Sequence, residues 1–153
     1  MRFFLLDRID DIDAHRSVRA RKLTSTAEHY WRDGGSGPQM PPTLVLEALC
    51  QAGTWLILES TGFERRAALL SVADVAFGAP VRPGDVLDIH GEVESFGADT
   101  AVLRGVVTVD GVEALRADGI MCVLLPADDL EDPEAVRRMH GALRRPAPVG
   151  RPS

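Results

Sequence analysis

The sequence predicts an α+β fold in which one long central helix is wrapped by an antiparallel β-sheet. Residues 41–61 carry helical start and stop signals and are apolar nearly all round, which is typical of a helix buried on every side. Apolar segments with strand character precede and follow this helix. A sheet curved around the helix is the simplest way to bury it within a single domain of 153 residues.

The elements follow in order along the chain. Pro41 and Pro42 suit the first turn of the helix, and Gly62 provides a stop signal after its last turn. The pair Asp110-Gly111 predicts a tight turn between two apolar strands. The expected strands cover residues 3–12, 17–25, 68–75, 86–94, 101–109 and 114–125.

The chain changes character after Pro126. Residues 1–126 are interpreted as the folded domain, and residues 127–153 as an appended segment with a short helix at about 133–144 and a disordered Pro-rich tail. Four arginines gather toward the end of this helix: Arg137, Arg138, Arg144 and Arg145. They are interpreted as a solvated face, with a docking patch for an acidic carrier protein as the alternative.

Composition and charge remove several classes of function. With Lys+Arg 17 and Asp+Glu 23, the net charge of −6 disfavours nucleic acid as a partner. No apolar run reaches the roughly 18 to 20 residues of a membrane helix, and the short patch before Asp7 is not a signal peptide. Cys50 and Cys122 do not have the spacing of metal ligands, so we predict that they are reduced thiols in a cytoplasmic protein. We also predict no metal and no cofactor.

Three blocks of the sequence resemble one enzyme family. The segments 38–41 and 46–52 resemble the motif G-H-F-P-x-x-P-x-M-P-G-x-L-x-x-E-A-x-A-Q of the 3-hydroxyacyl-[acyl-carrier-protein] dehydratases. Residues 4–8 and 77–85 resemble the opening strand and the R-F-x-x-P-V-x-P-G-D segment of that family. The resemblance implies the hotdog fold, a dimer, and removal of water from 3-hydroxyacyl thioesters of acyl carrier protein or coenzyme A.

The resemblance assigns roles to residues of this chain. Glu47 takes the place of the helix carboxylate that assists catalysis, and Gln51 lies four residues on, on the same helix face. The family histidine falls on Asp33, or on Gly34 if the loop is one residue shorter. Asp33 is therefore a candidate base, with a turn residue before two glycines as the alternative.

The substrate-binding candidates of the resemblance lie at the helix start. Pro42 stands where the family has a glycine whose N–H polarises the thioester carbonyl, and proline has no N–H. Thr43 offers a neighbouring amide in its place, and Met40 belongs to the same motif. Together with Gln51 and Gly34, these residues form the expected binding site.

Three functions stay open on the sequence alone. The first is a dehydratase-like enzyme with an altered site in fatty-acid or polyketide-type biosynthesis, working as a homodimer or with a related hotdog chain. The second is an acyl thioesterase that uses Glu47 or Asp33 as its carboxylate. The third is a non-catalytic partner subunit that leaves the histidine to another chain.

Overall fold

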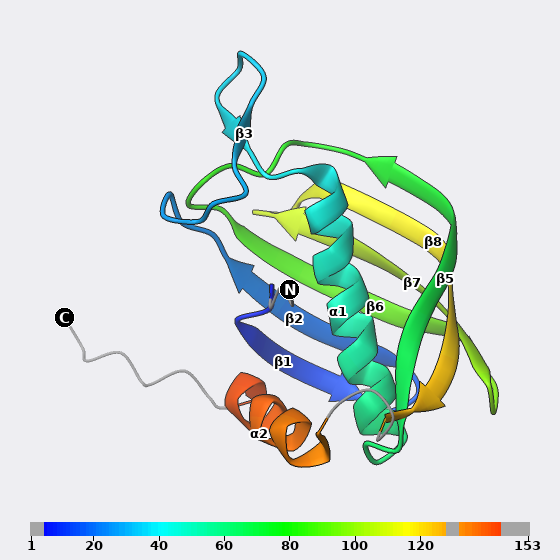
Figure 1. The fold of residues 1–153 in the computed structure, drawn as a ribbon. Coiled ribbons are helices and arrows are strands. Elements are labelled where there is room, and N and C mark those ends of the chain that lie inside the picture. Colours follow the sequence, from blue (N-terminus) through cyan, green and yellow to red (C-terminus); the bar gives the residue numbers. More distant parts are fainter. Residues whose placement is uncertain (1–4, 128–131, 145–153) are drawn as a thin grey trace.

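A six-stranded antiparallel sheet curves around one long helix (Figure 1). The computed structural model describes residues 5–127 and 132–144, and the strand order in the sheet is β1-β2-β6-β7-β8-β5. A separate two-stranded hairpin, β3 with β4, precedes the helix. The strands are β1 Arg8–Asp13, β2 Ser17–Leu23, β3 Arg32–Asp33, β4 Pro38–Gln39, β5 Arg65–Phe77, β6 Val86–Phe96, β7 Thr100–Val109 and β8 Val112–Pro126.

The long helix α1, Pro42–Ser60, lies across the concave face of the sheet. Pro42 occupies its first position, where a missing N–H costs nothing. At its end the amide of Thr61 donates to the carbonyl of Ile57 at 3.1 Å, and the amide of Gly62, which turns the chain with φ +60°, donates to the carbonyl of Glu59 at 3.3 Å. The predicted helix over 41–61 is therefore confirmed to within one residue at each end.

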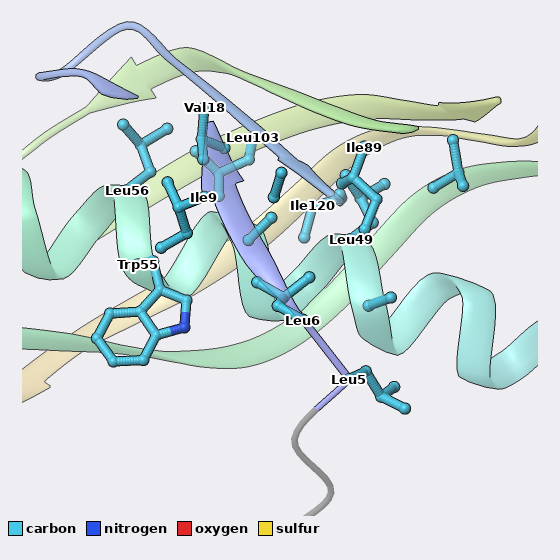
Figure 2. Close-up of a cluster of buried hydrophobic side chains, with 14 of the residues drawn as sticks. Leu5, Leu6, Ile9, Val18, Leu49, Trp55, Leu56, Ile89, Leu103 and Ile120 are labelled. Carbon is cyan, nitrogen blue, oxygen red and sulfur yellow. The ribbon is translucent and has the colours of Figure 1, made fainter. Parts of the chain in front are cut away.

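The core fills the space between α1 and the sheet (Figure 2). Leu49 and Leu56 of α1 face side chains from the central strands, among them Ile89, Leu103 and Ile120. Burying one such side chain contributes about 2 kcal/mol, so this helix–sheet contact is the main source of stability. The arrangement confirms the predicted α+β architecture and is the hotdog fold.

The structure revises one expectation about local elements and confirms another. The first strand was predicted from residue 3, but β1 begins at Arg8, and the described residues Leu5 and Leu6 are buried without strand structure. The amide of Leu5 donates to Oε1 of Gln51 at 2.9 Å, so its bond is to α1 instead of a strand. Between the last two strands, Asp110 and Gly111 have φ of 49° and 81°, as the predicted tight turn requires.

A second helix, α2 Pro133–Arg144, lies beside β1 at the C-terminal end of α1 (Figure 1). It buries Val136 and Leu143, and Nε2 of His140 lies 2.8 Å from Oε2 of Glu59. This helix matches the one expected at about 133–144. The domain boundary at 126 stays a prediction, and Arg145 and the tail to 153 lie outside the described residues.

A lysine is buried beneath the loop that leads to the hairpin. Lys22 is 4% exposed, and its Nζ donates to Oε1 of Glu28 at 2.7 Å. The hydroxyl of Tyr30 donates to the other oxygen of Glu28. Burial alone would raise the pKa of Glu28, but the hydrogen bonds from Lys22 and Tyr30 outweigh it and lower that pKa.

Glu28→Gln is expected to lower the free energy of unfolding by about 2 kcal/mol at pH 7, because it removes the charged partner of a buried ammonium. A lowered folded-state pKa stabilises the protein above the unfolded value and loses that effect as pH falls through the folded value. The difference between wild type and Glu28→Gln should therefore shrink below about pH 4. Urea unfolding at several pH values measures it, and a difference that stays constant down to pH 3 would contradict this account.

Candidate active site

The loop that carries the candidate residues is held against the loop between β5 and β6. The amide of Met40 donates to the carbonyl of Val81 at 2.8 Å, and Met40 is buried. The guanidinium of Arg82 donates to the carbonyl of Ser36 at 2.9 Å. The carboxylate of Asp85 accepts from the amide of Arg82 at 2.8 Å. This bond closes a turn that holds Arg82 in place for its contact with Ser36. The family-like segment 77–85 therefore positions the hairpin.

Asp33 ends the first strand of that hairpin and is exposed. Its Oδ1 accepts hydrogen bonds from the amides of Gly35 at 2.8 Å and Gly37 at 3.2 Å. Both glycines have positive φ, 113° and 96°, which other residues adopt only with strain. The carboxylate of Asp33 thus closes the turn, and the hairpin projects beyond the N-terminal end of α1 (Figure 1).

The two bonds of Asp33 predict different results for two substitutions. Asp33→Ala removes the acceptor and should cost about 1 kcal/mol of stability. Asp33→Asn keeps an Oδ1 acceptor and should change stability by no more than about 0.5 kcal/mol. Urea denaturation of both variants measures this, and equal losses would contradict the assigned loop contacts.

The start of α1 offers one backbone donor to a ligand. The amides of Leu44 and Val45 bond to the carbonyl of Pro41 at 2.9 Å and 3.3 Å. Pro42 has no N–H, and the geometry of a first turn directs the amide of Thr43 outward from the helix end. Both Pro42 and Thr43 are exposed. The amide of Thr43 is therefore the donor that this helix end presents.

Glu47 lies in the second turn of α1 and is exposed in the single chain. Its Oε1 accepts from Nε2 of Gln51 at 3.3 Å, and Oε1 of Gln51 accepts from the amide of Leu5. The chain by itself does not bury this carboxylate, because the apolar helix positions around Glu47 face the sheet and Glu47 does not.

A pocket of about 430 Å³, counting the space at its mouth, opens between α1 and the sheet. Cys50, Gly53 and Thr54 line it from the helix, and strands β5 to β8 line it from below. Cys50 follows Glu47 by three residues, so the two share one helix face. The carboxylate therefore lies near this lining residue, whose thiol its charge affects.

The thiol of Cys50 is a wall of this pocket and not an activated nucleophile. Burial, with a further contribution from the nearby charge of Glu47, raises its pKa to about 12. Burial also raises the pKa of Cys122, which lines the pocket from β8. Both thiols are protonated at neutral pH and present apolar surface.

Comparison with protein families assigns the chain. The FabA-like domain family matches residues 1–118. The chain belongs to this family.

Curated relatives of this FabA-like chain include 3-hydroxyacyl-[acyl-carrier-protein] dehydratases named FabZ. That of Solibacter usitatus is 33% identical over 87% of this chain and 82% of the relative. That of Thermomicrobium roseum is 31% identical over 88% of this chain and 87% of the relative.

Solved structures with the same fold include thioesterases. A hypothetical thioesterase from Streptococcus pneumoniae TIGR4, solved with coenzyme A, has a TM-score of 0.54 at 21% identity and covers 76% of this chain and 84% of that one. The E. coli PaaI protein has a TM-score of 0.62 at 13% identity and covers 77% of this chain and 79% of that one. At these identities the similarity shows the fold.

Within this FabA-like chain, the structure brings some of the predicted site residues together. Glu47 and Gln51 are hydrogen-bonded, and Met40, Pro42 and Thr43 lie at or next to the start of the same helix. Asp33 and Gly34 belong to the hairpin instead. The sequence analysis did not identify the strand residues that line the pocket, because they come together only when the sheet forms. Gly53, a glycine inside a helix, was the one local signal that could have indicated a close contact there.

Among the described residues, no helix is long and apolar enough to cross a membrane. The same part of the chain contains no group of His, Cys, Asp and Glu arranged to hold a metal ion.

Proposed function

We propose that this chain acts as a dehydratase-type protein on 3-hydroxyacyl and 2-enoyl thioesters of acyl carrier protein, with an altered active site. The observation that carries the proposal is Glu47, an exposed carboxylate on α1 that shares a helix face with the pocket residue Cys50 in a FabA-like chain. The pocket accommodates the acyl chain, and the thioester end of the substrate is held near the carboxylate.

In this proposal Glu47 donates the proton with which the C3 hydroxyl leaves as water. Dehydration removes a proton from C2 and the hydroxyl from C3, so it needs a proton acceptor and a proton donor. Glu47 is exposed in the single chain and becomes enclosed when substrate and a second chain cover it. The outward amide of Thr43 replaces the family glycine N–H and polarises the thioester carbonyl.

A second hotdog chain is part of the proposed site. Strand β5 forms one edge of the sheet and exposes Leu69, Leu70 and Phe77 by 49%, 60% and 58%. Long apolar edges of this kind pair with another strand. The opposite edge, β1, is short and acidic, and α2 lies beside it. A chain that pairs with β5 also covers the pocket lining from Leu69.

The second catalytic group has two candidate sources. One is Asp33 from the hairpin of an identical partner. The other is an imidazole from a related chain, with this chain contributing Glu47 and the pocket walls. The bonds of Asp33 to Gly35 and Gly37 favour the second source, because they commit one carboxylate oxygen to the turn.

A thioesterase is the remaining alternative, in which Glu47 activates water or attacks the thioester. The observation that favours it is that none of the described residues lining the pocket is a histidine. Water attack on the carbonyl would release a free thiol, whereas dehydration leaves the thioester intact. We place the protein in the cytoplasm in either case, in fatty-acid or polyketide-type biosynthesis.

The test is an assay of the purified chain with 3-hydroxybutyryl and crotonyl thioesters of an acyl carrier protein, followed by mass spectrometry. Interconversion of the two thioesters, by the chain alone or after a histidine-bearing hotdog chain is added, is the expected result. Activity of the chain alone that is lost in Asp33→Asn would assign the second group to the hairpin. Free thiol without interconversion would replace the proposal by a thioesterase. A folded chain that is inactive alone but active with a histidine-bearing hotdog chain would identify a half-site.

A further inference from the structure

The pocket beside Glu47 is open at one end and closed at the other. Half-buried Cys50 and Thr54 and half-exposed Leu69 line its outer part. Leu56, 0% exposed, and Leu103, 5% exposed, line its inner part. An acyl chain that enters past Cys50 therefore runs from the edge strand β5 toward β7.

Two close contacts between α1 and the sheet close the inner end. A Cβ at Gly53 would lie 2.7 Å from Cδ1 of Leu103, and a Cβ at Gly105 would lie 2.5 Å from Cδ1 of Leu49. Each leucine thus rests directly against a glycine of the opposing element. At these two points no space remains for an acyl chain to continue between α1 and β7.

The wall of the pocket is chemically suited to a hydrocarbon. Ala67, Leu69, Ile120 and the protonated thiols supply apolar surface, and the hydroxyl of Thr54 donates to the carbonyl of Cys50 at 3.1 Å. The charged lining residues Glu92 and Arg104 are partly exposed and pair with each other at 2.9 Å. The 430 Å³ includes open space at the mouth, so the enclosed part of the pocket is small. A short chain fills such a space, and a long chain has to displace Leu103.

We propose that Leu103, packed against Gly53, sets the acyl-chain limit of this site and restricts it to short chains of butyryl to hexanoyl size. This inference rests on the proposed function for the identity of the ligand as an acyl thioester. Leu103 is in this account a specificity-determining residue that contacts the end of the acyl chain. It takes no part in proton transfer.

Binding of saturated acyl-coenzyme A thioesters to the full chain tests the limit without requiring turnover. Isothermal titration with the butyryl, hexanoyl, octanoyl and dodecanoyl thioesters should give the tightest binding at butyryl or hexanoyl, and at least tenfold weaker binding for dodecanoyl. Leu103→Ala should bring dodecanoyl to within threefold of hexanoyl. Leu103→Val, which removes less of the side chain, should shift the preference toward octanoyl and provides the test if the alanine variant does not fold.

Leu87→Ala is the matched control, because Leu87 is a fully buried strand leucine outside the pocket lining. It should lower stability and leave the chain-length preference unchanged. Binding that tightens steadily up to dodecanoyl in wild type, an absence of binding to every thioester, or an unchanged preference in folded Leu103 variants would overturn the inference. Graded binding without any turnover of hydroxyacyl or enoyl thioesters would leave the pocket assignment standing and remove the proposed function.

Discussion

Glu47→Gln is expected to lower thioester turnover by at least about 100-fold, because it removes the carboxyl group that protonates the leaving hydroxyl. Folding should survive the change. Glu47 is exposed, and the amide oxygen of glutamine can still accept the bond from Gln51. The free energy of unfolding should therefore change by less than about 0.5 kcal/mol. Steady-state rates and a urea titration on the same preparation measure both effects.

Glu59→Gln is the matched control for this experiment. Glu59 lies on the same helix near its C-terminal end, where its carboxylate contacts His140. Its replacement loosens the contact with α2 and should leave turnover within twofold of wild type. A Glu47→Gln protein that keeps its turnover would show that the carboxylate is structural.

Gly105→Ala is expected to have the largest effect on stability. The added Cβ would lie 2.5 Å from Leu49 and 2.6 Å from the backbone carbonyl of His90. Leu49 has to move, and so does the neighbouring strand, because a backbone oxygen cannot rotate away. Overpacking of this kind should cost about 3 kcal/mol. Thermal unfolding should then show a fall in Tm of about 10 °C.

The same substitution at another glycine should have the opposite sign. Gly141 is exposed on α2, and a Cβ there meets no atom within 4 Å. Gly141→Ala should raise the free energy of unfolding by about 0.5 kcal/mol, because alanine restricts the unfolded chain and favours a helix. Equal Tm values for the two variants would contradict the close packing of α1 on β7.

Much of the fold follows from local signals in the sequence. The prolines at 41 and 42 and the glycine at 62 delimit α1 in the structure as they did in the sequence. Leu5 and Leu6, the described part of the apolar patch, are not in a strand, and the amide of Leu5 bonds to Gln51. That partner is 46 positions away and belongs to another element, so no local pattern reveals it.

The site was only partly accessible from the sequence. The position of the family motif in the sequence predicted Glu47, Asp33 and the residues at the helix start as site residues. The pocket depends on which strand residues face α1, and Leu103 meets Gly53 only through the register of β7 in the sheet. The loop bonds of Asp33 also depend on backbone angles at Gly35 and Gly37. Both features are set by tertiary geometry.

The most direct test of the account is isotope transfer from heavy-oxygen water to a crotonyl thioester of acyl carrier protein, comparing wild type with Glu47→Gln. If the chain alone transfers no heavy oxygen, a histidine-bearing hotdog partner is added to the assay. The account predicts heavy oxygen at C3 of the hydroxyacyl thioester with wild type, and at least a 100-fold slower rate with the variant. Heavy oxygen found only in a released carboxylate, or equal labelling by both proteins, would contradict it.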